Sequence, residues 1–156
     1  MEIVRVTTVD HLKHIELLFR EYEEFLGVDL SFQGFEAEVE KLPGKYAGPK
    51  GALLLATDGI AAMGCVAVRE LDGEECEMKR LYVKPENRGN GLGRRLAKGI
   101  IEEAVDLGYS LMRLDTLVRL KEAMQLYESL GFNKTGLYYD NPLSGVEYWE
   151  LSLKKK

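Results

Sequence analysis

The stretch that decides the fold is Arg80-Leu-Tyr-Val-Lys-Pro-Glu-Asn-Arg-Gly-Asn-Gly-Leu-Gly-Arg-Arg95, in which an apolar strand passes through a glycine-rich bend into a helix. The helix is predicted because apolar residues recur at every fourth position, at Leu92, Leu96, Ile100 and Ala104. A helix that begins in glycines leaves its first backbone N–H groups unpaired and open to close approach. Such a terminus holds phosphate or pyrophosphate, so the sequence predicts a ligand that carries phosphate.

Two common nucleotide-binding motifs do not fit this bend. A Walker loop ends in Gly-Lys-Ser/Thr, whereas the bend ends in Gly93-Arg94-Arg95 and has no hydroxyl for magnesium. A Rossmann fingerprint has the spacing Gly-x-Gly-x-x-Gly, whereas the bend reads Gly89-x-Gly91-x-Gly93. The plain alternative is a flexible loop before a helix. It is disfavoured because an arginine, three glycines and an amphipathic helix coincide.

Length and charge limit the class of protein. The chain has 156 residues, of which 46% are hydrophobic, and this predicts one globular domain, residues 1–156. The net charge of −5 argues against nucleic acid as the main partner and suits cationic substrates such as amines. Without a signal segment or a membrane-spanning stretch, a cytoplasmic protein is expected. Cys65 and Cys76 are expected as reduced thiols in a sheet, and no metal site is predicted.

Hydrophobic periodicity predicts a mixed α/β fold. Asp-Gly pairs at 58–59 and 72–73 separate apolar runs and predict a three-stranded antiparallel meander. The strand–helix–strand order around the glycine-rich bend predicts a parallel pair with a right-handed crossover. The expected strands are 2–7, 52–57, 60–70, 74–83, 111–116, 134–138 and 146–153, and the expected helices are one capped by Thr7 or Thr8 that reaches Leu26, and others at about 35–42, 92–107 and 120–130. The order is β-α-α-β-β-β-α-β-α-β-β, with helices on both faces of the sheet and a solvated lysine tail at 154–156.

At this point the chain resembles the GNAT superfamily of N-acetyltransferases. The matching pieces are Val83-x-Pro85, Arg88-x-x-Gly91-x-Gly93 and Leu126-Tyr127-x-x-x-Gly131-Phe132. The family has Gln/Arg-x-x-Gly-x-Gly/Ala at the loop and Leu-Tyr-x-x-x-Gly-Phe at the end of a later helix. The resemblance covers essentially the whole chain. It implies a GNAT-like fold with splayed fourth and fifth strands, and transfer of an acetyl group from acetyl-coenzyme A to a primary amine by direct attack, without a metal.

The resemblance places acetyl-coenzyme A between those two strands. Its pyrophosphate would lie on the N–H groups of the glycine-rich bend, and its pantetheine arm would pair like an extra strand with the backbone before the bend. Leu81 and Val83 would offer only their backbone, because their side chains are expected in the core. The candidate cofactor-binding residues are Leu81, Tyr82, Val83, Arg88, Gly89, Asn90, Gly91, Leu92, Gly93 and Arg94.

Tyr127 and Glu77 are the candidate catalytic residues that the resemblance implies. Tyr127 would donate to the leaving sulfur. Because a phenol ionises near about 10 and a thiol near about 8.5, a hydrogen bond to the developing thiolate is expected rather than complete proton transfer. Glu77 matches the strand position where the family often has a general base, and it would need burial or a water relay to raise its basicity. The alternatives are a core tyrosine and a surface carboxylate paired with Lys79 or Arg69.

The acceptor amine is not identified by the sequence. Family acceptor sites are built by the first two helices, their loop and the final hairpin, which correspond to 27–46 and 138–148. The first helix is rich in carboxylates, and an acidic, aromatic rim would suit a cationic amine, although most rings could simply be core. Asp115 and Thr116 would lie near the acceptor or cap the next turn. The aromatic residues concerned are Phe32, Phe35, Tyr46, Tyr138, Tyr139 and Tyr148.

Several kinds of acceptor and two other functions are compatible with the sequence. The acceptor could be a free polyamine, an amino acid, an antibiotic, a metabolite, a peptide N-terminus or a lysine side chain. One alternative function is a coenzyme A-binding sensor or regulatory module without turnover, and the other is an interaction domain in which the bend is only a turn. Tyr127 favours the enzyme. A possible homodimer follows from an exposed strand at 146–153 that could pair across a twofold axis.

Overall fold

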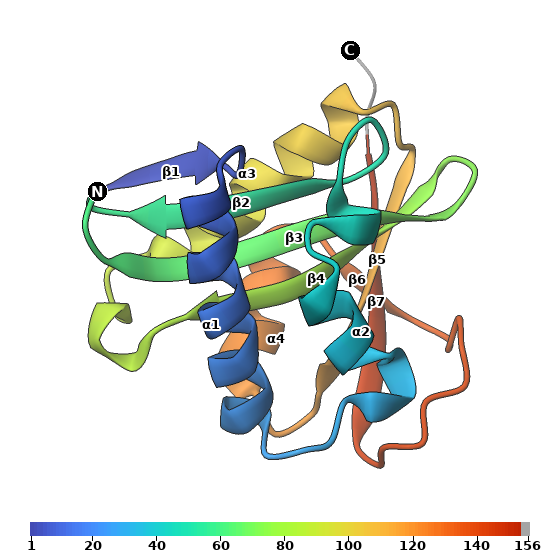
Figure 1. Ribbon diagram of the computed structural model, residues 1–156. Helices are drawn as coiled ribbons and strands as arrows, with labels where there is room; N and C mark the ends of the chain where they lie inside the picture. The colour runs from blue at the N-terminus through green and yellow to red at the C-terminus, as the bar shows by residue number, and fades with distance from the viewer. Residues whose placement is uncertain (154–156) are drawn as a thin grey trace.

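One seven-stranded sheet organises the computed structural model, which describes residues 1–153 (Figure 1). The strand order is β1-β2-β3-β4-β5-β7-β6. As the sequence predicts, β4 and β5 are parallel, and the other neighbouring strands are antiparallel. The lysine tail expected at 154–156 lies outside the described residues. The strands are β1 (Glu2–Arg5), β2 (Ala52–Thr57), β3 (Ala62–Asp72), β4 (Glu75–Val83), β5 (Leu111–Leu117), β6 (Asn133–Thr135) and β7 (Val146–Ser152).

Helices cover both faces of the sheet, α1 and α2 on one side and α3 and α4 on the other (Figure 1). The N-terminus of α1 is capped by Thr8, whose side chain accepts a hydrogen bond from the His11 N–H at 3.1 Å. Its C-terminus ends on Gly27, at φ 67°. The α-helices are α1 (Val9–Leu26), α2 (Phe35–Glu40), α3 (Leu92–Asp106) and α4 (Lys121–Ser129), and short 3₁₀ turns lie at Ser31–Gln33, Gly44–Tyr46 and Pro85–Asn87.

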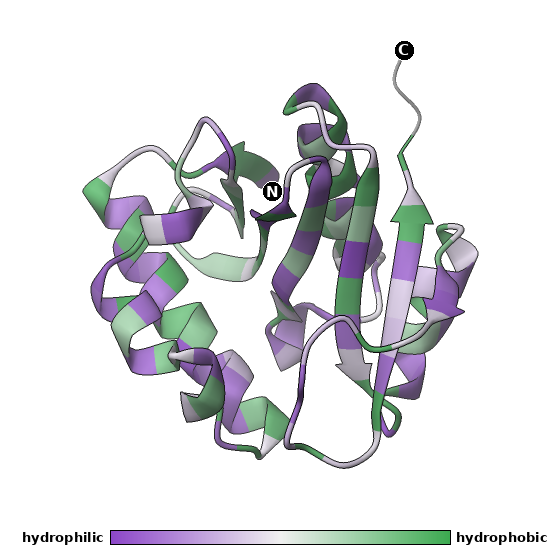
Figure 2. Cartoon of the chain, turned by 90° about the vertical axis from the view of Figure 1, so that its right-hand side faces the viewer, coloured by the Kyte–Doolittle hydropathy of each residue, from purple (hydrophilic) through white to green (hydrophobic). Residues whose placement is uncertain are grey.

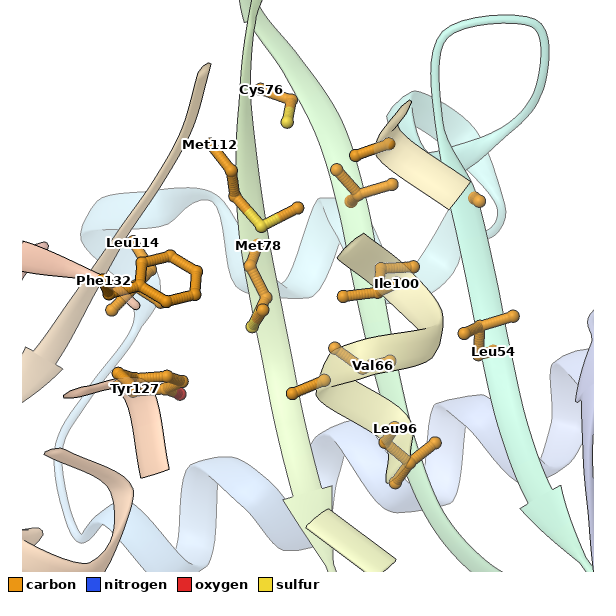
Figure 3. Packing of buried hydrophobic residues seen from close by; sticks show 14 of the residues in the cluster. Leu54, Val66, Cys76, Met78, Leu96, Ile100, Met112, Leu114, Tyr127 and Phe132 are labelled. Atoms are coloured by element: carbon orange, nitrogen blue, oxygen red, sulfur yellow. The ribbon is translucent and has the colours of Figure 1, made fainter. Parts of the chain in front are cut away.

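Alternation along the strands divides the core into two layers. Alternate residues of a strand point to opposite faces of the sheet. In β2 and β3, Leu54 and Val66 therefore pack against α3, whereas Leu55 and Cys65 pack against α1. Figure 2 shows how hydrophobic (green) and hydrophilic (purple) residues are distributed along the helices and strands. Figure 3 shows the α3 layer, in which Leu96 and Ile100 lie over the strands that carry Leu54 and Val66. The helix face predicted from the sequence is therefore the buried one.

The C-terminal hairpin differs from the sequence prediction. Its first strand, expected at 134–138, is only Asn133–Thr135, because Tyr138 leaves the sheet and its hydroxyl donates to Glu77 at 2.6 Å. The second strand, β7, lies between β5 and β6, so its middle residues 148–150 are paired on both sides. The exposed-edge prediction for 146–153 is therefore wrong at those residues, and β6 is the strand at that end of the sheet.

Candidate active site

The site opens where β4 and β5 part. These strands pair only from Glu75 opposite Leu111 to Glu77 opposite Arg113. Beyond that point a bulge interrupts the pairing of β4 with β3, and Arg80 adopts a left-handed conformation with φ 60°. A bulge bends its strand and leaves a residue outside the ladder, so β4 turns away from β5. The predicted splaying of the fourth and fifth strands is thereby present, and two cavities lie in the opening.

The outer cavity, of about 460 Å³, has the expected cofactor strand along one side. It is lined by Leu81, Tyr82 and Val83 of β4, by Arg88 and by the first turn of α4. The side chains of Leu81 and Val83 were expected in the core. They are half-buried and pack against the α3-side core. The volume of the outer cavity lies in the range of cavities that hold drug-sized ligands.

The glycine-rich bend ends in an open helix terminus. Gly91 is the N-cap of α3 at φ 82°, Gly89 has φ 90°, and no side chain caps the helix. Since only the N–H of Arg95 bonds back to the Gly91 carbonyl at the start of the helix, the N–H groups before it are available to an anion. Leu92 is buried in the core, while Asn90 is exposed.

The two arginines of the bend have different environments. Arg88 lies over the Phe25 ring, 4.6 Å from its centroid, donates from Nε to the Val83 carbonyl at 2.9 Å, and lines the outer cavity. Arg94 instead donates to the Ser129 hydroxyl of α4 at 2.7 Å. Sequence reasoning missed two further cations of this cavity, Arg119 and Lys121. They follow β5 at the start of α4, and their positive charge next to a predicted cofactor strand was the signal that could have found them.

Tyr127 stands where the outer and inner cavities meet, because it lines both. Its ring packs edge-on against Phe132, with 5.7 Å between centroids, and Figure 3 shows it beside Leu114. Within residues 1–153 its hydroxyl has no hydrogen-bond partner, and it is not one of the fully buried polar atoms that lack a partner. Burial, and then the neighbouring Tyr22 and Asp115, raise the pKa of Tyr127 well above that of a free phenol. The group is thus a protonated donor at neutral pH.

The inner cavity is smaller, about 50 Å³, and three charged side chains line it: Lys79, Arg80 and Asp115. Arg80 forms a two-pronged ion pair with Glu38 of α2, with N–O distances of 3.0 and 3.1 Å. Asp115 accepts hydrogen bonds from the Tyr139 hydroxyl and, at 3.1 Å, from the Asn141 amide. Asp115 also lines the outer cavity, so a carboxylate and the Tyr127 hydroxyl share the junction.

Glu77 lies elsewhere. It is 1% exposed, and it lines neither of the two cavities. Its carboxylate accepts hydrogen bonds from Arg69 at 2.9 Å and from the Tyr138 hydroxyl at 2.6 Å, and the Lys79 ammonium lies 3.8 Å away. The alternative of a surface carboxylate is therefore wrong as to exposure, while both partners that it named, Arg69 and Lys79, are present. Its role as a base stays a prediction without direct access to either cavity.

The expected acidic rim is not present at the inner cavity. No carboxylate of α1 lines it in the described part of the chain. These carboxylates serve elsewhere: Glu16 pairs with Arg20 at 3.5 Å, and Glu23 accepts from the Leu30 N–H at 3.1 Å. Of the six aromatic residues expected there, Phe35 and Tyr46 belong to the α1-side core, as the alternative interpretation held.

Three further observations concern the thiols, metal-binding side chains and helices of the described residues. Cys65 and Cys76 are free and buried in β3 and β4, and burial raises the pKa of the Cys76 thiol to about 12, so neither thiol is poised as a nucleophile. No cluster of three or more metal-binding side chains occurs within residues 1–153. In the same range, no helix combines the length and the apolar character that crossing a bilayer requires.

These features define a class of α/β protein: a mostly antiparallel sheet is opened between two parallel strands, and the opening holds an outer cavity, lined by β4 and Arg88, that meets a small polar cavity. Comparison with known proteins identifies the class. Residues 49–134 match the acetyltransferase (GNAT) domain family. An uncharacterised N-acetyltransferase of Schizosaccharomyces pombe is 44% identical over 157 residues, covering 99% of this chain and 96% of that relative.

Solved structures share the fold. An acetyltransferase from Streptococcus agalactiae has a TM-score of 0.80 at 21% identity, and the match covers 97% of this chain and 98% of that one. The spermidine N-acetyltransferase of Vibrio cholerae, solved with coenzyme A and spermine, has a TM-score of 0.72 at 19% identity, with 97% and 95% covered. The chain belongs to the GNAT family and is an acetyl-coenzyme A-dependent acyltransferase. The resemblance read from the sequence is confirmed.

Proposed function

We propose that this protein acetylates the primary amine of a small molecule by direct attack on acetyl-coenzyme A. The observation that carries the proposal is the Tyr127 hydroxyl, which has no partner within residues 1–153 and stands at the junction of the two cavities. The amine nitrogen attacks the thioester carbonyl, the carbon–sulfur bond breaks, and the thiolate receives a hydrogen bond from Tyr127. The nitrogen then releases its second proton to water, which leaves the neutral amide. A thioester held in line with an amine needs no covalent enzyme intermediate.

The outer cavity is the proposed cofactor site. The pyrophosphate lies on the N–H groups of Gly89–Gly93, because the Arg88 N–H donates to the Pro85 carbonyl at 3.3 Å, and the pantetheine amides pair with the backbone of Leu81–Val83. Arg88, Arg119 and Lys121 supply positive charge along the cavity. Arg94, which the resemblance included, is engaged with Ser129 and contributes only to the general field of the helix terminus.

For the amine, the proposed partner is Asp115 rather than Glu77. An amine arrives as an ammonium ion and must lose a proton before it attacks. Asp115 lines both cavities beside Tyr127, and within residues 1–153 it has no cationic partner. Its carboxylate can therefore hold the ammonium ion and pass its proton to water. Glu77 is proposed as a positioning residue that holds Tyr138 and Lys79.

Two measurements test the activity. Coenzyme A at a hundred times its dissociation constant is expected to stabilise the fold by about 2.7 kcal/mol, seen as a higher melting temperature. With acetyl-coenzyme A and a panel of amines, free thiol is expected to appear. No thermal shift would support an interaction domain. Stabilisation without thiol release for any amine would support a coenzyme A sensor instead of an enzyme.

The base assignment is tested by comparing Asp115→Asn with Glu77→Gln. We expect Asp115→Asn to lower kcat/KM for the amine by about thirtyfold, because a charge-assisted hydrogen bond to the ammonium ion is lost. Glu77→Gln is expected to keep the pH–rate slope of the wild type. A flattened slope in Glu77→Gln, with a normal one in Asp115→Asn, would return the base role to Glu77 through Tyr138.

The remaining expectations from the sequence stay predictions. A cytoplasmic location is compatible with two free thiols, since disulfides are rare in reducing compartments. A homodimer now lacks its original argument, because the middle of β7 is paired on both sides. That residues 1–156 form a single domain likewise stays a prediction.

A further inference from the structure

The charges of the inner cavity are unevenly compensated. Of its three charged side chains, Arg80 is neutralised by Glu38, since both are buried and joined by two hydrogen bonds of 3.0 and 3.1 Å. Lys79 and Asp115 are not paired with each other in this way: each has neutral hydrogen-bond partners facing the cavity. These two side chains therefore decide which ligand charges the cavity accepts.

Lys79 is a buried cation without a carboxylate of its own. Its side chain is 7% exposed, and its Nζ donates to the Gln33 amide oxygen at 3.0 Å. The nearest carboxylate, Glu77, is 3.8 Å away and already holds Arg69 and the Tyr138 hydroxyl. An ammonium group has three donors, so hydrogen-bonding capacity remains. Burial lowers the pKa of Lys79 to about 8, and the negative charge of Glu77 opposes this shift.

Asp115 is the complementary group at the other end. Its carboxylate accepts from Tyr139 and Asn141, and no cation lies within ion-pair distance in the part of the chain that the structure describes. A neutral relay joins the two ends: Lys79 donates to Gln33, and the Gln33 amide donates to Tyr139 at 3.2 Å. Lys79 shares the single carboxylate of Glu77 with Arg69, so the cavity has one positive end that is only partly compensated and one negative end without a cationic partner, held apart by neutral side chains.

We propose that the acceptor is a small amine that also carries a carboxylate, an amino acid or a close analogue, with its ammonium ion on Asp115 and its carboxylate on Lys79. This rests on the proposed acetyl transfer to an amine. The nitrogen to be acetylated lies at the Asp115 end, because that residue and Tyr127 share the junction with the outer cavity. A polyamine is disfavoured, because its second ammonium ion would meet Lys79, and no carboxylate of α1 lines the cavity in the described part of the chain.

The test compares matched acceptors: amino acids against the amines left when their carboxylate is removed, with a polyamine included. For the wild type we expect kcat/KM to be at least about thirtyfold higher for the amino acid, since the carboxylate gains a charge-assisted hydrogen bond. Lys79→Met is expected to abolish this preference by raising KM for the amino acid. Lys45→Met is the matched control, because Lys45 pairs with Glu38 at 3.4 Å but lines neither cavity.

Each outcome decides a different question. Equal or better turnover of amines without a carboxylate in the wild type overturns this inference, and the proposed acetyl transfer stands. Absence of thiol release with every acceptor overturns the proposed function instead. In that event calorimetry with the coenzyme A-loaded protein decides: binding of the amino acid that is lost in Lys79→Met supports the inference, and absence of binding overturns it. Comparison of acceptors in the wild type needs no variant, so a folding defect in Lys79→Met does not affect it.

Discussion

Replacing Gly91 by valine is expected to weaken the binding of coenzyme A at least tenfold. Gly91 has φ 82° at the N-cap of α3, a conformation that costs a residue with a Cβ atom about 1–2 kcal/mol and a β-branched residue more. To avoid this cost the bend has to change its backbone angles, which moves the N–H groups that would face the pyrophosphate. The dissociation constant of coenzyme A, measured by calorimetry, checks the expectation.

Gly108→Val provides the matched control. Gly108 follows the opposite end of α3, has φ 97°, and its missing Cβ would also meet open space. The two variants therefore carry a similar backbone strain, and both are expected to lower the melting temperature. Only Gly91→Val is expected to lose affinity. Unchanged affinity in Gly91→Val would remove the glycine-rich bend from the cofactor site and, with it, the basis of the proposed function.

Substitution of Tyr127 by phenylalanine is expected to lower kcat at least tenfold, with the affinity for coenzyme A nearly unchanged. The ring packing against Phe132 is retained in the variant, whereas the hydroxyl at the junction of the cavities is lost. A donor aimed at charge that develops in the transition state contributes about a hundredfold or more in buried sites. Steady-state kinetics with saturating acetyl-coenzyme A, together with calorimetry, separates kcat from binding.

Tyr109→Phe is the control for loss of a buried hydroxyl. Tyr109 is 4% exposed, and its hydroxyl donates to the Lys50 carbonyl at 2.6 Å, away from both cavities. We expect this variant to lose stability and to keep its kcat. Equal kcat values for Tyr127→Phe and the wild type would show that the thiolate leaves without help from the phenol.

Local chemistry explains why much of the cofactor side could be predicted. The glycine spacing requires left-handed backbone angles at Gly89 and Gly91, and the apolar repeat after them fixes which face of α3 is buried. Tyr127 follows from its helix and from the family resemblance. The neighbours of these residues are close in sequence or lie in regular elements, so their positions depend little on distant parts of the chain.

The acceptor side could not be predicted in the same way. The carboxylates of α1 looked available in the sequence, yet Arg20 and Lys84 pair with Glu16 and Glu21. Glu77 was predicted either as a base or as a surface carboxylate paired with Lys79 or Arg69, and in the structure Arg69 and Tyr138 surround its carboxylate. The pairs Glu21–Lys84 and Glu77–Tyr138 join segments that are far apart in the sequence, so they depend on how the chain folds, and composition does not contain that information.

The family resemblance implied the place of Tyr127, and the sequence by itself determined the open terminus of α3 and the parallel pair β4–β5. These follow from backbone sterics and hydrophobic periodicity, which act over a few residues. Tertiary structure alone decided that Asp115, Lys79 and Gln33 line one cavity, and that Glu77 lies outside it. These side chains come from β4, β5 and the loop before α2, and their charges acquire a role only where burial removes water and brings them together.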